Sequence, residues 1–345
     1  MQAKMFGDTF SMLKWIDRRF SENGLRGIPV KALKWIYWNL GFHHLFLHRF
    51  RTLRDFQSSG LRGVWLGFRR RRLFPLRNRL LCNRPVNVEI GDLSFLMAPI
   101  GAQATDVWSR SRCEHLEISF IMEILQPGMV FLDIGANAGV FTLAAAKKRP
   151  DVISYAFEPC KWTFQLLENN IRLNSLKNVQ AYRVALGDYC GVATMQLNDQ
   201  GLDGLNTIGQ PSHPECRVVA LEEVMIMTLS EFLGLHGISR VDAIKADVEG
   251  AELLVFEGAK DLLKREDAPI ILYESYAMCT KGFKYHPVEI MWYLRDCGYS
   301  FFLFDGKKGR IILRERDHGY DAMFIAAKPK KFPVLRRFMN ESCLN

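Results

Sequence analysis

VFLDIGANAG, residues 130–139, joins an apolar run to a turn that carries two glycines. The run is short and apolar, which is typical of a buried strand, and a helical pattern follows the second glycine. A strand that enters a helix through such a turn directs backbone N–H groups and the positive helix end toward the crevice above the sheet. The motif therefore predicts a cofactor site at Asp133, Gly135, Asn137 and Gly139. Alone it is weak evidence, because it is not the full G-x-G-x-x-G pattern.

A carboxylate follows the next predicted strand. Residues 154–157 form a second apolar run, and Glu158 comes directly after it, about twenty residues beyond the glycine turn. A carboxylate at this position accepts hydrogen bonds from both ribose hydroxyls of an adenosine, and the same geometry serves NAD. A structural alternative is that Glu158 caps the helix that begins at Pro159. The two motifs together predict the class of cofactor but not its identity.

Short β-branched runs alternate with helical stretches from Met129 onward, which is typical of an open parallel sheet covered by helices. We predict an α/β fold with a Rossmann-like sheet of seven strands. No helical pattern separates the last two runs, so we expect the final strand to be antiparallel. An insertion after the third strand carries a glycine-rich segment that we expect to cover a substrate. The predicted strands are 130–134, 152–157, 179–185, 241–246, 269–273, 299–304 and 321–327, and those of the insertion are 192–197 and 217–221.

The chain is basic at one end. Residues 1–85 hold 18 Lys and Arg against 4 Asp and Glu, and the remainder of the chain is net acidic. Helical spacing and aromatic residues predict a basic helical N-terminal extension, followed by a small β-hairpin over residues 86–102. Residues 103–328 then form the main domain and residues 329–345 a basic tail. The cluster Arg69–Arg72 beside apolar side chains suggests contact with an anionic membrane, whereas solvated arginines on a helical subdomain are the alternative.

Cysteine usage and hydropathy limit the cellular context. The 8 Cys are scattered and include no C-x-x-C pair, so we expect a reducing compartment and no zinc site. No secretory signal and no run of about 18 apolar residues is found. We expect a cytoplasmic protein that is soluble or peripheral to the inner membrane face. We do not expect it to bind nucleic acid.

The ordered motifs resemble the FkbM family of methyltransferases. This resemblance covers residues 106–328 and departs from the family pattern at Ala246, where a bulky aliphatic residue is usual, and at Cys160. It implies a class I methyltransferase fold and S-adenosyl-L-methionine as cofactor. The motifs are Asp133–Gly139, Ala156–Pro159, Leu167–Asn170 with Asn174, Ala185–Gly187 and Lys245–Glu252.

The resemblance also implies roles for individual residues. Asp133 and the glycine turn approach the methionine part of the cofactor, and Glu158 binds its ribose. Ala185 and Asp188 flank the adenine. The implied reaction is O-methylation of a hydroxyl on a sugar, a glycan or a secondary metabolite, which needs in-line positioning and a proton acceptor.

Carboxylates at the ends of the fourth and fifth strands supply the candidate base. Asp247 is the first choice, Glu249 the second, and Glu274 binds the acceptor or serves as a further base. Alternatively, Asp247 caps a helix that opens near Gly250, with Glu249 and Glu252 as acids in its first turn. His286 precedes a proline at a helix start and is a weaker candidate.

Two other functions compete with methyl transfer. A nicotinamide-dependent oxidoreductase would share the sheet, but the incomplete glycine pattern and the antiparallel final strand disfavour it. A non-catalytic module that binds membrane or nucleic acid would use the Arg69–Arg72 cluster. The sequence contains no His or Cys cluster, and hard-cation sites have little spacing signature that could be tested. We therefore predict no metal site.

Overall fold

The computed structural model describes residues 86–90, 93–97, 116–199, 203–213, 216–304, 313–316 and 322–338. All of them belong to one compact unit of the chain, residues 74–345. The basic helices predicted for residues 1–85 lie outside the described residues. The predicted hairpin is present as β1 (Val86–Ile90) and β2 (Leu93–Met97), which pair antiparallel.

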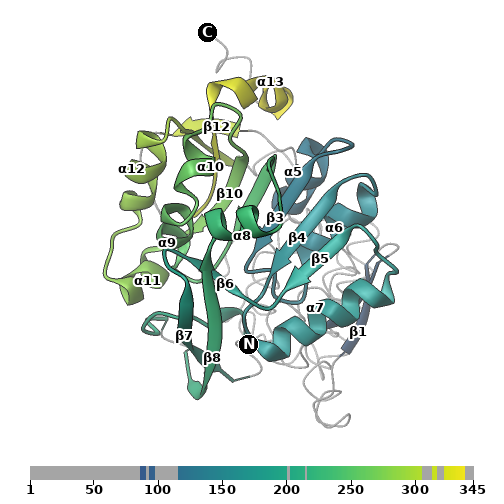
Figure 1. Ribbon diagram of the computed structural model, residues 1–345, viewed down its shortest axis with the longest axis vertical. Helices are drawn as coiled ribbons and strands as arrows, with labels where there is room; N and C mark the ends of the chain where they lie inside the picture. The colour runs from purple at the N-terminus through teal and green to yellow at the C-terminus, as the bar shows by residue number, and fades with distance from the viewer. Residues whose placement is uncertain are drawn as a thin grey trace, which may run out of the picture. The chain divides into compact units, whose positions relative to one another are not determined.

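An eight-stranded sheet organises the unit (Figure 1). The five strands from β10 to β5 are parallel, and β13 lies antiparallel between β10 and β11. The antiparallel final strand is thus confirmed, while β12 adds an edge strand that was not predicted. Across the sheet the strands are β12 (Leu313–Arg316), β11 (Ser300–Phe304), β13 (Ala322–Ala327), β10 (Ile270–Ser275), β9 (Ala243–Ala246), β3 (Val130–Ile134), β4 (Ile153–Phe157) and β5 (Val179–Tyr182).

Alternating apolar residues bury both faces of this sheet. Along β3, Leu132 and Ile134 enter one core while Phe131 enters the other. The first core is closed by α8 (Leu229–Leu235), α9 (Glu252–Glu257), α10 (Lys260–Lys264) and α12 (Val288–Asp296). The opposite face is covered by α5 (Leu116–Ile124), α6 (Val140–Lys148), α7 (Lys161–Leu173) and α13 (Phe332–Leu335). The predicted strand–helix alternation therefore corresponds to a three-layer α/β arrangement.

The predicted strand 179–185 is divided between two sheets. β5 ends at Tyr182, and β6 (Ala185–Gly187) instead joins a three-stranded sheet with β8 (Val218–Thr228) and β7 (Gly191–Asn198). β7 and β8 pair antiparallel and leave the main sheet as a two-stranded arm (Figure 1). The insertion consequently forms a sheet of its own, in which β6 pairs parallel with β8.

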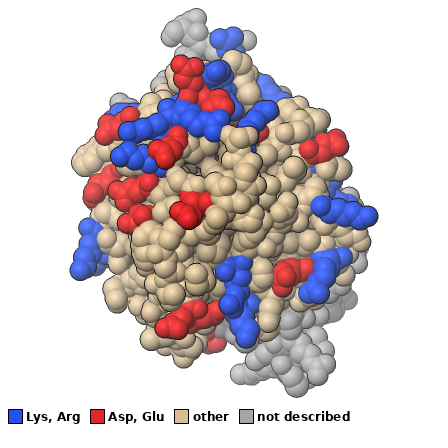
Figure 2. Space-filling model, viewed as in Figure 1, with Lys and Arg blue, Asp and Glu red and all other residues tan. Residues whose placement is uncertain are grey.

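Charged side chains on the surface of this unit are of both signs. In the view of Figure 2, Lys and Arg gather beside Asp and Glu toward the top, and the middle of the face carries few charges. The described part of the chain contains no helix long and apolar enough to cross a bilayer.

Candidate functional site

A cavity of about 390 Å³ opens at the carboxyl ends of β3, β4, β9 and β10. Its volume falls within the range of small-molecule sites, and its place beside β3 is where the strand order reverses, as expected for an open α/β sheet. Its wall comprises Ile134–Asn137, Val140, Phe141, Phe157–Pro159, Val184–Leu186, Met195, Gly204–Ile208, His213, Lys245, Asp247–Glu249, Ala251 and Glu274.

The turn after β3 packs closely against the backbone that follows β9. Gly135 has φ +75°, and a Cβ there would lie 1.9 Å from the carbonyl oxygen of Asp247. The N–H groups of Gly135 and Ala136 both donate to the carbonyl of Phe157, at 3.0 and 2.9 Å. Gly139, also left-handed at φ +93°, precedes α6. Only glycine fits at Gly135, because the neighbouring strand-end backbone occupies the space of a side chain.

Glu158 lies at the end of β4 and faces the same cavity. Its Oε2 accepts the N–H of Asn137 at 2.9 Å, while Oε1 accepts the N–H of Cys160 at 3.0 Å and the hydroxyl of Thr163 at 2.8 Å. Burial nevertheless raises the pKa of Glu158 to about 7, against the effect of these donors. The carboxylate is thus fixed in place, and further donors such as ribose hydroxyls would favour its charged form.

Apolar side chains form the wall beyond Glu158. Ala185 lines the cavity with its neighbours Val184 and Leu186, and Met195 of β7 packs against Ala185. The structure does not bring Asp188 to this wall, because the chain turns outward after β6 and leaves Asp188 exposed. The predicted contact of Ala185 and Asp188 with the adenine stays a prediction.

Asp133 is fully buried and does not line the cavity. Its Oδ2 accepts the N–H of Thr142 at 2.9 Å and the hydroxyl of Thr142 at 2.5 Å, so Asp133 ties the end of β3 to the first turn of α6. Its Oδ1 lies 3.4 Å from Nζ of Lys245. Asp133 thus lies behind the cavity wall, where its contacts position the turn, and its role toward the methionine part stays a prediction.

Three carboxylates also line the cavity. Asp247 follows β9, Glu249 lies two residues later with a left-handed φ of 54°, and Glu274 is on β10. Burial, together with the charge of Asp247, raises the pKa of Glu249 to about 8 and that of Glu274 well above its usual value. Asp247 is the member of the group with a counter-ion, because Lys245 Nζ lies 3.5 Å from its Oδ2. The predicted base candidates are thus all brought together.

The capping alternative for Asp247 is wrong. Helix α9 begins at Glu252 with Ala251 as its N-cap, and that cap makes no side-chain hydrogen bond. Glu252 instead turns back to accept the N–H of Val248 at 2.9 Å, and burial raises its pKa to about 7. Glu252 therefore supports the loop that carries Glu249, which leaves Asp247 free to face the cavity.

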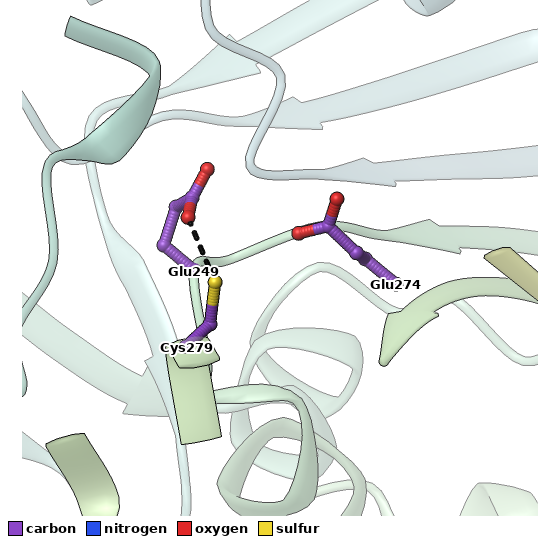
Figure 3. Close-up of side chains that lie close together, drawn as sticks. All are labelled: Glu249, Glu274 and Cys279. Carbon is purple, nitrogen blue, oxygen red and sulfur yellow. Dashed lines mark hydrogen bonds between the residues drawn. The ribbon is translucent and has the colours of Figure 1, made fainter. Parts of the chain in front are cut away.

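Cys279 adds a thiol to the acidic group. It lies on α11 (Ala277–Thr280) and donates to Oε2 of Glu249 at 3.3 Å. Figure 3 shows this hydrogen bond and the Glu274 carboxylate turned toward the pair. One ligand atom from each of the three residues lies within 4.8 Å of the others, a spacing that is compatible with a metal ion. The prediction that the protein binds no metal remains a prediction.

The glycine-rich insertion contributes to the cavity wall. Residues 203–213 begin with the short helix η2 (Asp203–Leu205), and Thr207 bridges to Gln196 of β7. The hydroxyl of Thr207 donates to the carbonyl of Glu249 at 3.2 Å, so the insertion is attached to the acidic loop. Nearby, η3 (Lys281–Phe283) contacts it through Gly282, whose carbonyl accepts from the N–H of Gln210.

Sequence reasoning missed several residues of the site. Phe141 and His213 line the cavity, and only their contacts with distant segments place them there, whereas Lys245 belongs to the predicted 245–252 motif. Conversely, His286 does not line it. The N–H of His286 donates to Glu289 Oε1 at 2.7 Å, which is a helix-start arrangement at α12.

Comparison with known proteins identifies a methyltransferase domain in this chain. Residues 133–301 match the model of the methyltransferase FkbM domain. "Methyltransferase 1" of Beauveria bassiana is 32% identical over 146 residues, which cover 38% of this chain and 58% of the relative. The 31-O-demethyl-FK506 methyltransferase FkbM of Streptomyces tacrolimicus is 28% identical over 169 residues, 40% of this chain and 62% of the relative. The chain thus spans less than two thirds of the length of each.

Solved structures resemble the chain less closely. Precorrin-6y C5,15-methyltransferase from Geobacter metallireducens aligns with a TM-score of 0.36 and 14% identity, over 63% of this chain and 88% of that one. A likeness this low has no bearing on function. The family match covers the glycine turn, Glu158 and all three carboxylates, and it confirms the predicted cofactor, S-adenosyl-L-methionine. Residues 133–301, just under half of the chain, thus match the methyltransferase FkbM domain.

Proposed function

We propose that the protein transfers a methyl group from S-adenosyl-L-methionine to a hydroxyl oxygen of a sugar, a glycan or a secondary metabolite. The observation that carries this proposal is a single cavity with a cofactor end and an acceptor end. We call the part lined by the glycine turn and Glu158 the cofactor end, and the part lined by Asp247, Glu249 and Glu274 the acceptor end.

The cofactor end fits an adenosine with an amino-acid part. Glu158, held by two backbone N–H groups, would accept the ribose hydroxyls, and the wall around Ala185 would contact the adenine. The turn at Gly135 would admit the methionine part close to the backbone. When bound, the cofactor supplies a methyl group activated by its positively charged sulfur.

Asp247 is the base in this proposal. Like charges in a buried group cannot all ionise, so Glu249 and Glu274, whose pKa values are raised, would hold protons. Lys245 pairs with Asp247, and the pKa of Glu249 is raised to about 8. Asp247 would take the proton of the acceptor hydroxyl, and protonated Glu249 and Glu274 would donate hydrogen bonds that orient the acceptor.

The name of the S. tacrolimicus relative supports oxygen as the methylated atom, because it describes a 31-O-demethyl substrate. Transfer to nitrogen would need no base of this kind if the amine entered uncharged. The proposal therefore predicts a methyl ether as the product.

Calorimetric titration with S-adenosylhomocysteine, and in parallel with NAD, tests the cofactor end. We expect S-adenosylhomocysteine alone to bind, and the Glu158→Ala variant to bind it at least about tenfold more weakly. The acceptor end is tested by incubating the enzyme with isotopically labelled S-adenosylmethionine and a panel of polyols, glycans and hydroxylated metabolites. Label recovered in an amine and in no ether would overturn O-methylation.

The basic N-terminal region has a separate proposed role. We infer from its charge and aromatic content that residues 1–85 dock the enzyme on an anionic membrane surface, where a lipid-linked glycan would be the acceptor. Sedimentation with liposomes tests this, and the full chain should bind phosphatidylserine vesicles more strongly than phosphatidylcholine vesicles. Equal binding to both would refute the docking role.

A further inference from the structure

Lys245 contacts both the glycine turn and Asp247. It lies on β9 and is 3% exposed, and its strand partner on β3 is Asp133. Among the described residues that line the cavity it is the only Lys or Arg. A buried ammonium group is costly unless neighbouring groups compensate its charge, so the contacts of Lys245 indicate its role.

The ammonium group joins both ends of the cavity. Nζ donates to the carbonyl of Gly135 at 2.7 Å, in the cofactor turn. It lies 3.4 Å from Asp133 Oδ1 and 3.5 Å from Asp247 Oδ2, the carboxylate at the acceptor end. It also lies 5.4 Å from the centre of the Phe141 ring, which favours a cation.

We propose that Lys245 is a positioning residue that holds the glycine turn against the acceptor end and keeps the charge of that end in balance. The inference rests on the proposed function and deepens it. Gly135 cannot carry a side chain, because the Asp247 backbone fills the space that a Cβ would need. The hydrogen bond from Lys245 therefore holds the Gly135 carbonyl in place.

The charge of Lys245 is maintained by its surroundings. Burial lowers its pKa, but Asp247 and Asp133 outweigh this effect and leave the pKa raised. Lys245 in turn lowers the pKa of Glu158, Glu249 and Glu274. Loss of the ammonium group should therefore move the ionisation of Glu158 to higher pH as well as release the turn.

The test measures S-adenosylhomocysteine binding by calorimetry from pH 6 to pH 9 on four variants. K245M removes the cation, K245R keeps it, and K177M is the matched control, since Lys177 is exposed and outside the cavity. K245M leaves Asp133 buried without a cation and is prone to unfold, so the double variant D133N/K245M removes both charges. Thermal melting checks that each variant is folded.

We expect K245M or the double variant to bind about tenfold or more weakly, with the midpoint of the pH dependence above that of the wild type. K245R should retain the wild-type midpoint, and K177M should match the wild type throughout. A folded K245M or double variant with wild-type affinity and midpoint would overturn the inference and leave the proposed function intact. Failure of the wild type itself to bind S-adenosylhomocysteine would overturn the proposed function and this inference with it.

Discussion

The two ends of the cavity differ in how their carboxylates are satisfied. At the cofactor end, Glu158 accepts two backbone N–H groups and the hydroxyl of Thr163. At the acceptor end, Glu249 accepts a hydrogen bond from the Cys279 thiol, and it lies near the carboxylates of Asp247 and Glu274. At the cofactor end the carboxylate is fixed by hydrogen-bond donors, whereas at the acceptor end three carboxylates share one nearby cation, Lys245.

This difference suits the two groups of carboxylates to different roles. A fixed carboxylate suits a ligand that is the same in every turnover, because the cost of ordering the site is met during folding. An acidic group with unevenly shared protons suits proton transfer, since neighbouring environments separate the ionisation of otherwise similar groups.

Asp247→Asn should have the largest effect. It removes the proposed base and keeps the shape of the side chain, so kcat should fall by about 10²–10⁴-fold. The affinity for S-adenosylhomocysteine should stay within about threefold, because Asp247 lies at the acceptor end. Steady-state kinetics with an acceptor found in the panel, alongside calorimetry, measure both quantities.

The matched control is Asp296→Asn, an exposed aspartate at the end of α12 that does not line the cavity. It should leave kcat and affinity unchanged. Unchanged turnover in Asp247→Asn would transfer the base role to Glu249 or Glu274.

Gly135→Ala tests the junction of the two ends. A Cβ at this position would meet the Asp247 backbone at 1.9 Å and would sit at φ +75°. We expect a loss of about 2–5 kcal/mol in the free energy of unfolding and no detectable cofactor binding. Gly128→Ala is the control, because it has φ +78° and no atom within 4 Å of its Cβ.

The control separates backbone strain from the clash. Gly128→Ala should cost only about 1–2 kcal/mol and should keep cofactor affinity. Chemical denaturation measures both variants, and equal losses in the two would show that the close approach at Gly135 is unimportant.

The pH dependence of cofactor binding should report Glu158. Its pKa is raised to about 7 in the folded protein, and ribose hydroxyls donate to the charged form. Affinity for S-adenosylhomocysteine should therefore rise about tenfold between pH 6 and pH 8. Because the folded pKa exceeds the ordinary value, the same group contributes stability at low pH that is lost as pH rises toward 7.

Glu158→Gln provides the comparison for this profile. The amide cannot ionise, so its affinity should be low and nearly constant from pH 6 to pH 8. A variant that retained the wild-type slope would assign the titration to another group, such as Glu252, whose pKa is also raised to about 7.

Chelation should have the smallest effect. We expect dialysis against EDTA to leave methyl transfer unchanged, since the raised pKa values of Glu249 and Cys279 disfavour the charged forms that bind metals. Activity that was lost on chelation and restored by one divalent metal would establish a metal site at Glu249, Glu274 and Cys279.

Much of the fold and the cofactor end is encoded locally in the sequence. Strand periodicity, the glycines at Gly135 and Gly139, and a carboxylate at Glu158 are each properties of a few neighbouring residues. The carboxyl ends of adjacent parallel strands meet at one edge, so Asp247 and Glu274 were expected to lie together, and they do. These features follow from periodicity and from backbone geometry that few residue types allow.

The remaining features depend on contacts between distant segments. The sequence does not show that the strand predicted at 179–185 divides between two sheets, that Asp188 turns outward, or that Thr207 attaches the insertion to Glu249. Nor does it show that Asp133 is buried beside Lys245, or that Cys279 bonds Glu249. Each of these depends on which side chains share a buried space, and packing of the whole chain decides that rather than local propensity.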